Sequence, residues 1–435
     1  MRTALALLLI ALASIAQDKP LPSKKAEIPG WLARHQRDDG LWPTPVVHSV
    51  CGRWAPGRCG PVDVEAAPRP PSPLTEKEKG FIDENIEALA ADEFEARENA
   101  TQALLDLGSR AASHLRVRSA YLDDLEAMDR VKSILKTFAR PSATNRVVAS
   151  SSMAILAYLG AGYTHLSRDV YGGVCSGKVV ESGLKALVAM QQEKGEIADA
   201  HAEDGVLAQA LASFALSEVY SLTSSERWRS PAQEALSALA RLQGKDGGWP
   251  RGSYETESDP LTTHFAMAAI KSAEIAEIDT SAEPKVALSK WVNALAVPSK
   301  MDSLDLVTLS VIAMHAALML RYRGDANGKA AAEAIARRAA AKPAEWDAMD
   351  HYLVSFVLFS CYGPTDNRWK DYVRWINSTG AAGQIVQAAA CDRGSWSPKS
   401  ALDRRFGPVW CTALYTLSME VFSRTGPRFQ LEWPF

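Results

Sequence analysis

The chain has 435 residues, of which 47% are hydrophobic and 23% charged, so it can bury a large core and is not intrinsically disordered. Lysine and arginine together number 48 against 51 aspartates and glutamates, which gives a net charge of −3. This balance lacks the electrostatic footprint of a nucleic-acid-binding protein. We therefore expect no nucleic-acid partner.

Residues 1–16 are predicted to be a cleaved signal peptide. Arg2 is the only charged side chain before an apolar run from Ala4 to Ala13, which is shorter than the roughly 20 residues of a membrane-spanning helix. Ser14-Ile15-Ala16 places small residues where signal peptidase requires them. A buried N-terminal helix is the alternative. The prediction is an exported protein, periplasmic or secreted, with no transmembrane segment.

Export makes disulfides possible, and the sequence has six cysteines. Cys51 and Cys59 flank a turn-rich loop that either closes as a disulfide or leaves both thiols unpaired. Cys361 and Cys411 lie in apolar helical runs, which favours buried free thiols. The cysteine spacing is not that of a metal site, and we expect neither a metal nor another cofactor.

Residues 66–74 form a proline-rich linker, and residues 75–140 are predicted to be a small helical subdomain inserted into the rest of the chain. Leu89, Phe94, Ala100 and Leu104 recur at helical spacing. The stretch from Asp92 to Gly108 resembles one HEAT-type helical hairpin. Such a hairpin provides either a surface for a protein partner or a brace without one.

From residue 146 onward, two kinds of helical segment alternate. Amphipathic segments face water on one side, whereas segments that are apolar all round are buried on every side. The period of about 50 residues is typical of a helical repeat array. The apolar segments are predicted at Val147–Gly160, Val206–Tyr220, Leu261–Ala276, Leu304–Leu320, Tyr352–Cys361 and Val409–Phe422. The amphipathic segments are predicted at Trp31–Gln36, Cys175–Gln192, Ser230–Gln243, Pro284–Ala296, Gly328–Ala341 and Trp369–Asn377.

A short motif recurs where amphipathic segments end. Gln36–Trp42 and Gln243–Trp249 both read Gln-x-x-x-Gly-x-Trp. Asp392–Trp396 is a copy that has lost the Gln, and Gln191–Gly195 is a copy that has lost the Trp. The Gly is predicted to end its helix in a left-handed turn. The Gln is expected to bond neighbouring backbone groups, and the Trp to cover the junction between adjacent helical pairs.

This motif resembles the QW repeat of the squalene cyclase and prenyltransferase superfamily. Leu156–His165 and Gly394–Leu414 are similar to an exported branch of that superfamily of planctomycete type. The resemblance implies an all-α fold, an α/α toroid of about six helical hairpins around a central cavity. The toroid would comprise residues 28–60 and 146–435, with the helical subdomain inserted between them.

The catalytic motifs of that superfamily are missing. The chain has no Asp-x-Asp-Asp, the acid of squalene-protonating cyclases, and no Asp-x-Cys of the zinc prenyltransferases. We therefore expect a non-catalytic module that binds an apolar or glycan ligand in the cavity, or a protein partner. Two alternatives stay open. One is a cavity enzyme, isoprenoid cyclase-like or a lyase, and the other is a structural component of an envelope assembly.

The starts of the apolar helices would line one mouth of such a ring. Asp204, Asp259, Asp302 and Asp347 are interpreted as helix caps. If the chain is an enzyme, Asp350 is the predicted acid or base, because apolar walls raise the pKa of a carboxyl, with His351 and His264 as its polar partners. The alternative is a solvated rim, in which these three side chains behave as free groups. Candidate ligand contacts are Asp259, Asp305, Tyr352 and Trp410, although aromatic residues of this kind also form packed cores.

Overall fold

The computed structural model describes residues 27–42, 74–107, 125–138, 143–171, 174–280, 282–320, 325–386 and 392–428, together with six single positions between residues 111 and 124. Within these residues the fold is almost entirely helical, and its strands are β1 (Val170–Tyr171) and β2 (Val174–Cys175), which pair as one short antiparallel hairpin. The predicted all-α class is confirmed.

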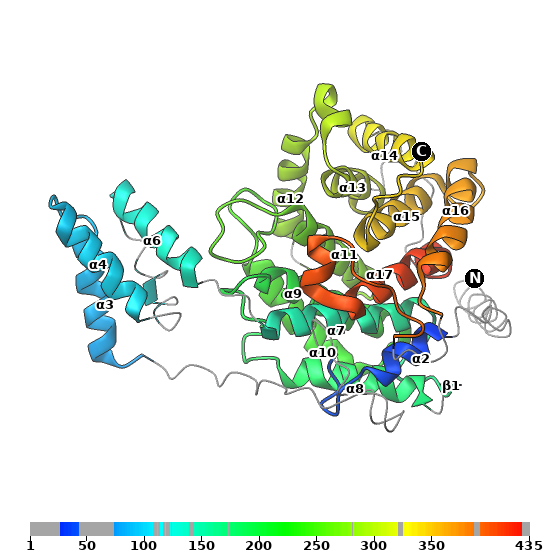
Figure 1. Ribbon diagram of the computed structural model, residues 1–435, viewed down its shortest axis with the longest axis horizontal. Helices are drawn as coiled ribbons and strands as arrows, with labels where there is room; N and C mark the ends of the chain where they lie inside the picture. The colour runs from blue at the N-terminus through cyan, green and yellow to red at the C-terminus, as the bar shows by residue number, and fades with distance from the viewer. Residues whose placement is uncertain are drawn as a thin grey trace.

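The apolar helices form the centre of the larger part of the molecule (Figure 1). They contact one another in chain order, and the last contacts the first, so that the contacts close into a cycle. These helices are α7 (Ala143–Gly160), α9 (Gly205–Thr223), α11 (Pro260–Ile275), α13 (Leu306–Met314), α15 (Ala348–Tyr362) and α17 (Ala401–Arg428). The chain continues from α13 into a π-helical stretch, η6 (His315–Leu320), and α17 is kinked at Gly407.

The amphipathic helices lie outside this cycle and bury one face against it, as their pattern predicts. Each follows an apolar helix in the chain or, for the first, contacts α17 directly. These helices are α2 (Glu27–Arg34), α8 (Ser176–Ala189), α10 (Arg229–Arg241), α12 (Ala282–Leu295), α14 (Ala326–Ala340) and α16 (Asn367–Gly383). Two short 3-10 helices, η4 (Glu226–Trp228) and η5 (Pro298–Ser303), lie in the connections.

The two complete copies of the Gln-x-x-x-Gly-x-Trp motif have the same geometry. Gln243 Nε2 donates to Gly247 O at 2.7 Å and to Pro284 O, in the first turn of α12, at 2.8 Å. Gly247 has φ +106, and a Cβ there would lie 2.2 Å from the backbone oxygen of Ala287. Only glycine fits this position, because it needs both a left-handed backbone and contact with the next outer helix. Trp249 Nε1 donates to Leu239 O at 2.8 Å.

The first copy repeats each of these contacts with α8 in place of α12. Gln36 Nε2 donates to Gly40 O at 2.8 Å and to Val179 O at 2.9 Å, and Trp42 Nε1 donates to Leu32 O at 2.8 Å. The two complete copies of the motif therefore join α2 to α8 and α10 to α12.

The sequence suggested that the third copy has lost its glutamine, but the structure supplies the amide group from another position. Gln384, at the end of α16, donates from Nε2 to Gly394 O at 3.1 Å and pairs through its backbone with Trp396. The amide lies ten residues before the glycine in place of four, and a longer loop separates the two. A motif defined by its four-residue spacing therefore does not identify Gln384.

The inserted segment forms α3 (Glu76–Ala88), α4 (Phe94–Asp106) and α6 (Leu125–Phe138), set apart from the other helices in Figure 1. It has its own apolar core, to which Ile86, Leu104 and Val131 contribute. Tyr254, from the connection between α10 and α11, packs against this core. We refer to α3, α4 and α6 as the helical lobe.

Several predicted features lie outside the described residues. They are the signal peptide, nearly all of the proline-rich linker and the Cys51–Cys59 loop. Cys361 and Cys411 are buried free thiols, as predicted. Among the described helices, α9 is long and apolar enough to cross a membrane, and 89% of its apolar window is buried inside the protein.

Candidate functional site at the mouth of the helical cycle

The starts of several inner helices meet at one end of the cycle, which we call the mouth. Asn145, in the first turn of α7, donates from Nδ2 to Asp199 O at 2.9 Å and to Glu203 O at 3.0 Å, just before α9. Ser150 Oγ of α7 donates to Phe406 O of α17 at 3.2 Å. Residues far apart in sequence therefore converge here, as expected for successive inner helices that run in the same direction.

Asp204 joins three elements of the mouth through two arginines. Its side chain is 1% exposed. Arg251, from the connection before α11, donates from Nε to Asp204 Oδ1 at 2.6 Å, and Arg405 of α17 donates from Nε to Oδ2 at 2.7 Å. Arg405 also pairs with Glu203. A buried carboxylate needs such partners, because an unpaired buried charge costs several kcal/mol.

The interpretation of Asp204 as a helix cap is wrong. Its side chain makes no capping hydrogen bond, and its backbone is left-handed with φ +60. The left-handed backbone is uncommon for a residue other than glycine, and both carboxylate oxygens are engaged by the two arginines. Asp302 is not a cap of an inner helix either; it lies in η5 and pairs with Arg337 at 2.5 Å.

Asp347 and Asp350 cap the start of α15 together. Asp350 N donates to Asp347 Oδ1 at 2.9 Å, and Asp347 N donates to Asp350 Oδ2 at 3.1 Å, a reciprocal capping box. Burial, followed by the negative charge of Asp347, raises the pKa of Asp350 to about 7. Burial and the neighbouring carboxylate therefore both favour the protonated form of Asp350.

Asp403, in the first turn of α17, is a further buried carboxyl near this pair. Its Oδ2 accepts from the backbone N–H of Lys399 at 3.2 Å. Burial and the charge of Asp347 raise its pKa, and burial together with the charge of Asp403 raises the pKa of the Cys411 thiol. No group of three or more His, Cys, Asp or Glu in the described part of the chain is arranged to hold a metal ion.

His351 points away from the centre of the cycle, into an aromatic box made with α16. Its ring lies 5.3 Å from Trp375, 5.8 Å from Trp346 and 5.5 Å from Tyr415, measured between ring centroids. The Tyr372 hydroxyl lies 3.1 Å from Nδ1. Burial and the positive charge of Lys399 lower the pKa of His351 to about 4, so the ring is neutral at pH 7.

His264 points the other way, into the interior of the cycle. There it contacts Tyr352, a predicted ligand contact, and Phe356. Its ring centroid is 5.8 Å from that of Tyr352 and 5.9 Å from that of Phe356. The structure thus brings His264 together with Tyr352. His351, which directly precedes Tyr352 on α15, faces a different set of residues.

Aromatic side chains fill the interior below the mouth. Phe265 of α11 stacks on Tyr352 of α15 at 5.9 Å and meets Trp410 of α17 at 6.5 Å. Helices α11 and α17 are three steps apart in a cycle of six, so the pair Phe265–Trp410 spans the interior. Tyr352 is 1% exposed and Trp410 0% exposed, so both side chains are packed against neighbouring groups. We call Phe265, Tyr352 and Trp410 the aromatic plug.

The remaining candidates have structural partners. Asp259 accepts from Thr262 N at 2.8 Å and Asp305 accepts from Thr308 N at 2.9 Å, which are N-caps of α11 and α13. The sequence analysis did not single out Arg251, Arg405 or Asp403. The available signal was a charged residue beside the start of an apolar helix.

No protein-family model matches this chain, and no curated protein matches it.

Proposed function

We propose that this chain is an exported α/α-toroid protein, similar in architecture to the squalene cyclase and prenyltransferase superfamily, that binds a polyhydroxylated ligand at its mouth. It does not cyclise an isoprenoid in a central cavity. Three features support this function: the recurring motif, the cyclic contacts of the inner helices and the polar groups at one end of the cycle.

The aromatic plug is the observation that carries this proposal. A cyclase needs an open interior to fold a long hydrocarbon chain, whereas Phe265 and Trp410 meet across the interior at a centroid distance of 6.5 Å. A ligand would therefore remain at the mouth. There, carboxylates accept and guanidinium groups donate hydrogen bonds, and sugar hydroxyls can satisfy both kinds of group.

Ligand titrations of the purified chain test this proposal. We expect a neutral oligosaccharide from a panel of β-linked and α-linked oligomers to raise the melting temperature, and Asp350→Asn to weaken that effect at least tenfold in ligand concentration. The control is Asp371→Asn, an exposed carboxylate on α16 that pairs with Arg374. Squalene should cause no shift and yield no cyclic product by mass spectrometry. Conversion of squalene, or a shift caused by squalene alone, would refute the proposal.

The second candidate function is general acid catalysis on such a ligand, and the raised pKa of Asp350 favours it. A proton donor works best when its pKa is near the working pH, and the pKa of Asp350 is about 7. Asp350→Asn should then abolish cleavage of a bound oligosaccharide while His351→Gln leaves most of it, because His351 faces α16. Binding without turnover by the unmodified chain would leave only the binding function.

A further inference from the structure

A groove runs between α4 and α6 on the helical lobe. Its volume is about 490 Å³. One residue of α4 and five of α6 line it: Thr101, Leu125, Glu126, Asp129, Arg130 and Ser133. Leu125, Asp129 and Ser133 are spaced four residues apart and share one face of α6.

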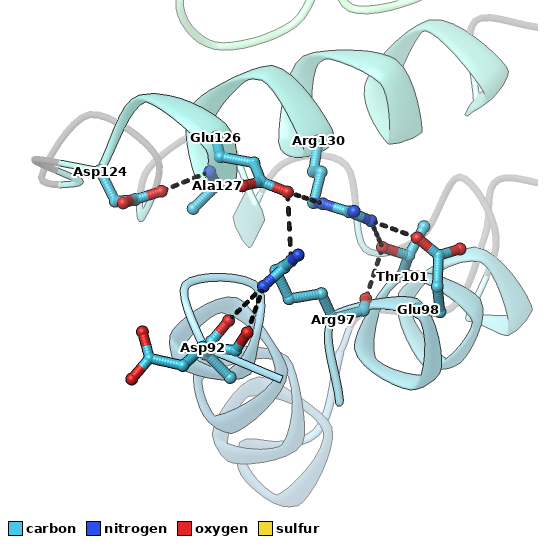
Figure 2. Close-up of polar contacts among 9 residues, drawn as sticks. Asp92, Arg97, Glu98, Thr101, Asp124, Glu126, Ala127 and Arg130 are labelled. Atoms are coloured by element: carbon cyan, nitrogen blue, oxygen red, sulfur yellow. Dashed lines mark hydrogen bonds and ion pairs between the residues drawn. The ribbon is translucent and has the colours of Figure 1, made fainter. Parts of the chain in front are cut away.

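Ion pairs hold the two walls of this groove at a fixed separation. Glu126 of α6 contacts Arg97 of α4 at 3.1 Å and Arg130 of its own helix at 3.2 Å. Arg130 continues to Glu98 at 2.7 Å and to the Thr101 hydroxyl at 3.3 Å. Figure 2 shows Arg97 and Arg130 converging on Glu126 from the two sides. The groove is therefore preformed, which reduces the entropy lost when a partner binds.

Two large apolar side chains lie exposed at one end of the groove. Leu125 is 76% exposed and Phe94, the first residue of α4, is 65% exposed. The Arg97 guanidinium lies 5.9 Å from the Phe94 ring centroid and also pairs with Glu126, next to Leu125. This arrangement places both apolar residues beside the same polar contact, so a single partner can cover both.

The charge of the helical lobe differs from that of the remaining chain. Residues 74–138 contain 14 acidic and 9 basic side chains, a net charge of −5, whereas the rest of the chain carries +2. Asp129 and Glu98 carry exposed carboxylates at the groove, with side chains 77% and 49% exposed. An acidic surface of this kind attracts a basic partner and repels nucleic acids and anionic membranes.

We propose that this groove binds an amphipathic helix of a partner protein, with leucine-like residues on one face and lysine or arginine on its flanks. The described part of the lobe has no strand edge to which an extended peptide could add, whereas a helix satisfies its own backbone hydrogen bonds and needs no such edge. α4 has 13 residues and α6 has 14, so the walls are about 20 Å long and match three to four helical turns.

Fluorescence anisotropy with the full chain tests this proposal. The probe is a fluorescein-labelled 18-residue Leu/Lys amphipathic helical peptide, and its Leu/Glu counterpart is the charge control. We expect the Leu/Lys peptide to bind and added salt to weaken the complex. The double variant Leu125→Ser/Asp129→Asn should raise the Kd at least tenfold with an unchanged circular dichroism spectrum.

The matched control is Leu166→Ser/Glu84→Gln, which removes a leucine that is 64% exposed from the larger part of the molecule and an exposed acid from α3. This variant should keep the Kd within about twofold of the unmodified chain. Equal weakening by the control pair, equal binding of the Leu/Glu peptide, or no binding at roughly 100 μM peptide would each overturn the proposal.

Discussion

Replacing Trp249 by alanine should destabilise the protein by about 3–5 kcal/mol, the range for buried aromatic residues. Trp249 is fully buried, and its indole N–H donates to Leu239 O at 2.8 Å. A buried aromatic side chain removes about 150–250 Å² from water, which corresponds to about 4–6 kcal/mol. Leu239 O also accepts from Leu242 N at 3.1 Å, so losing the indole leaves no carbonyl without a partner.

Urea unfolding followed by far-ultraviolet circular dichroism measures this loss. Trp249→Phe keeps most of the apolar area and removes the hydrogen bond, so it should cost about 1–2 kcal/mol. Trp42→Ala, in the other complete copy of the motif, has the same contact to Leu32 O and should match Trp249→Ala within about 1 kcal/mol. A loss below about 1 kcal/mol for Trp249→Ala would refute the role of this residue as the cover of the helix junction.

Three further predictions concern backbone conformation and pH. Gly247→Ala should cost about 3–5 kcal/mol, because its Cβ meets the oxygen of Ala287, whereas Gly162→Ala, with φ +88 and open space around it, should cost only about 1–2 kcal/mol. Asp350 has a folded pKa of about 7, above its ordinary 3.8. Its contribution to the free energy of unfolding therefore declines as pH rises from about 4 to 7. Relative to the unmodified chain, Asp350→Asn should be more stabilising at pH 8 than at pH 5, by about 2 kcal/mol. His351 has a folded pKa of about 4, below 6.5, so stability is lost as pH falls through that window, by about 2–3 kcal/mol in total, and His351→Gln should flatten this loss.

Melting temperatures of the variants at matched pH check all three predictions. Equal costs for the two glycine substitutions would show that contact with α12 is unimportant. A constant difference between Asp350→Asn and the unmodified chain across pH 5–8 would show that this carboxyl titrates normally. For His351, an acid transition that is unchanged in the glutamine variant would place the responsible group elsewhere.

The sequence predicted the inner and outer helices well, because an all-round apolar run and an amphipathic run each bury a different amount of surface. Val206–Tyr220 was predicted apolar and lies within α9, Gly205–Thr223. The capping roles of Asp259 and Asp347 were also predicted correctly, since capping depends on a side chain and the three residues that follow it. Asp305 was predicted as a ligand contact and is a cap instead.

Contacts between distant segments could not be predicted in the same way. His351 and Tyr352 are neighbours in sequence, yet one faces α16 and the other the interior, a difference set by the rotation of α15. The two arginines on Asp204 come from the connection before α11 and from α17. Pairing of this kind depends on how the cycle closes, and no local pattern records it.

The contact between α7 and α17 has a consequence for synthesis of the chain. Ser150 and Phe406 are joined by a hydrogen bond although 256 residues separate them. At about 5–20 residues per second, α17 follows α7 from the ribosome after roughly 13–50 s. During that time, the face of α7 that α17 will cover stays uncovered. A chaperone that holds apolar segments would act in this interval. A circular permutant that joins α17 to α2, and so shortens the delay, should reduce aggregation of the nascent protein.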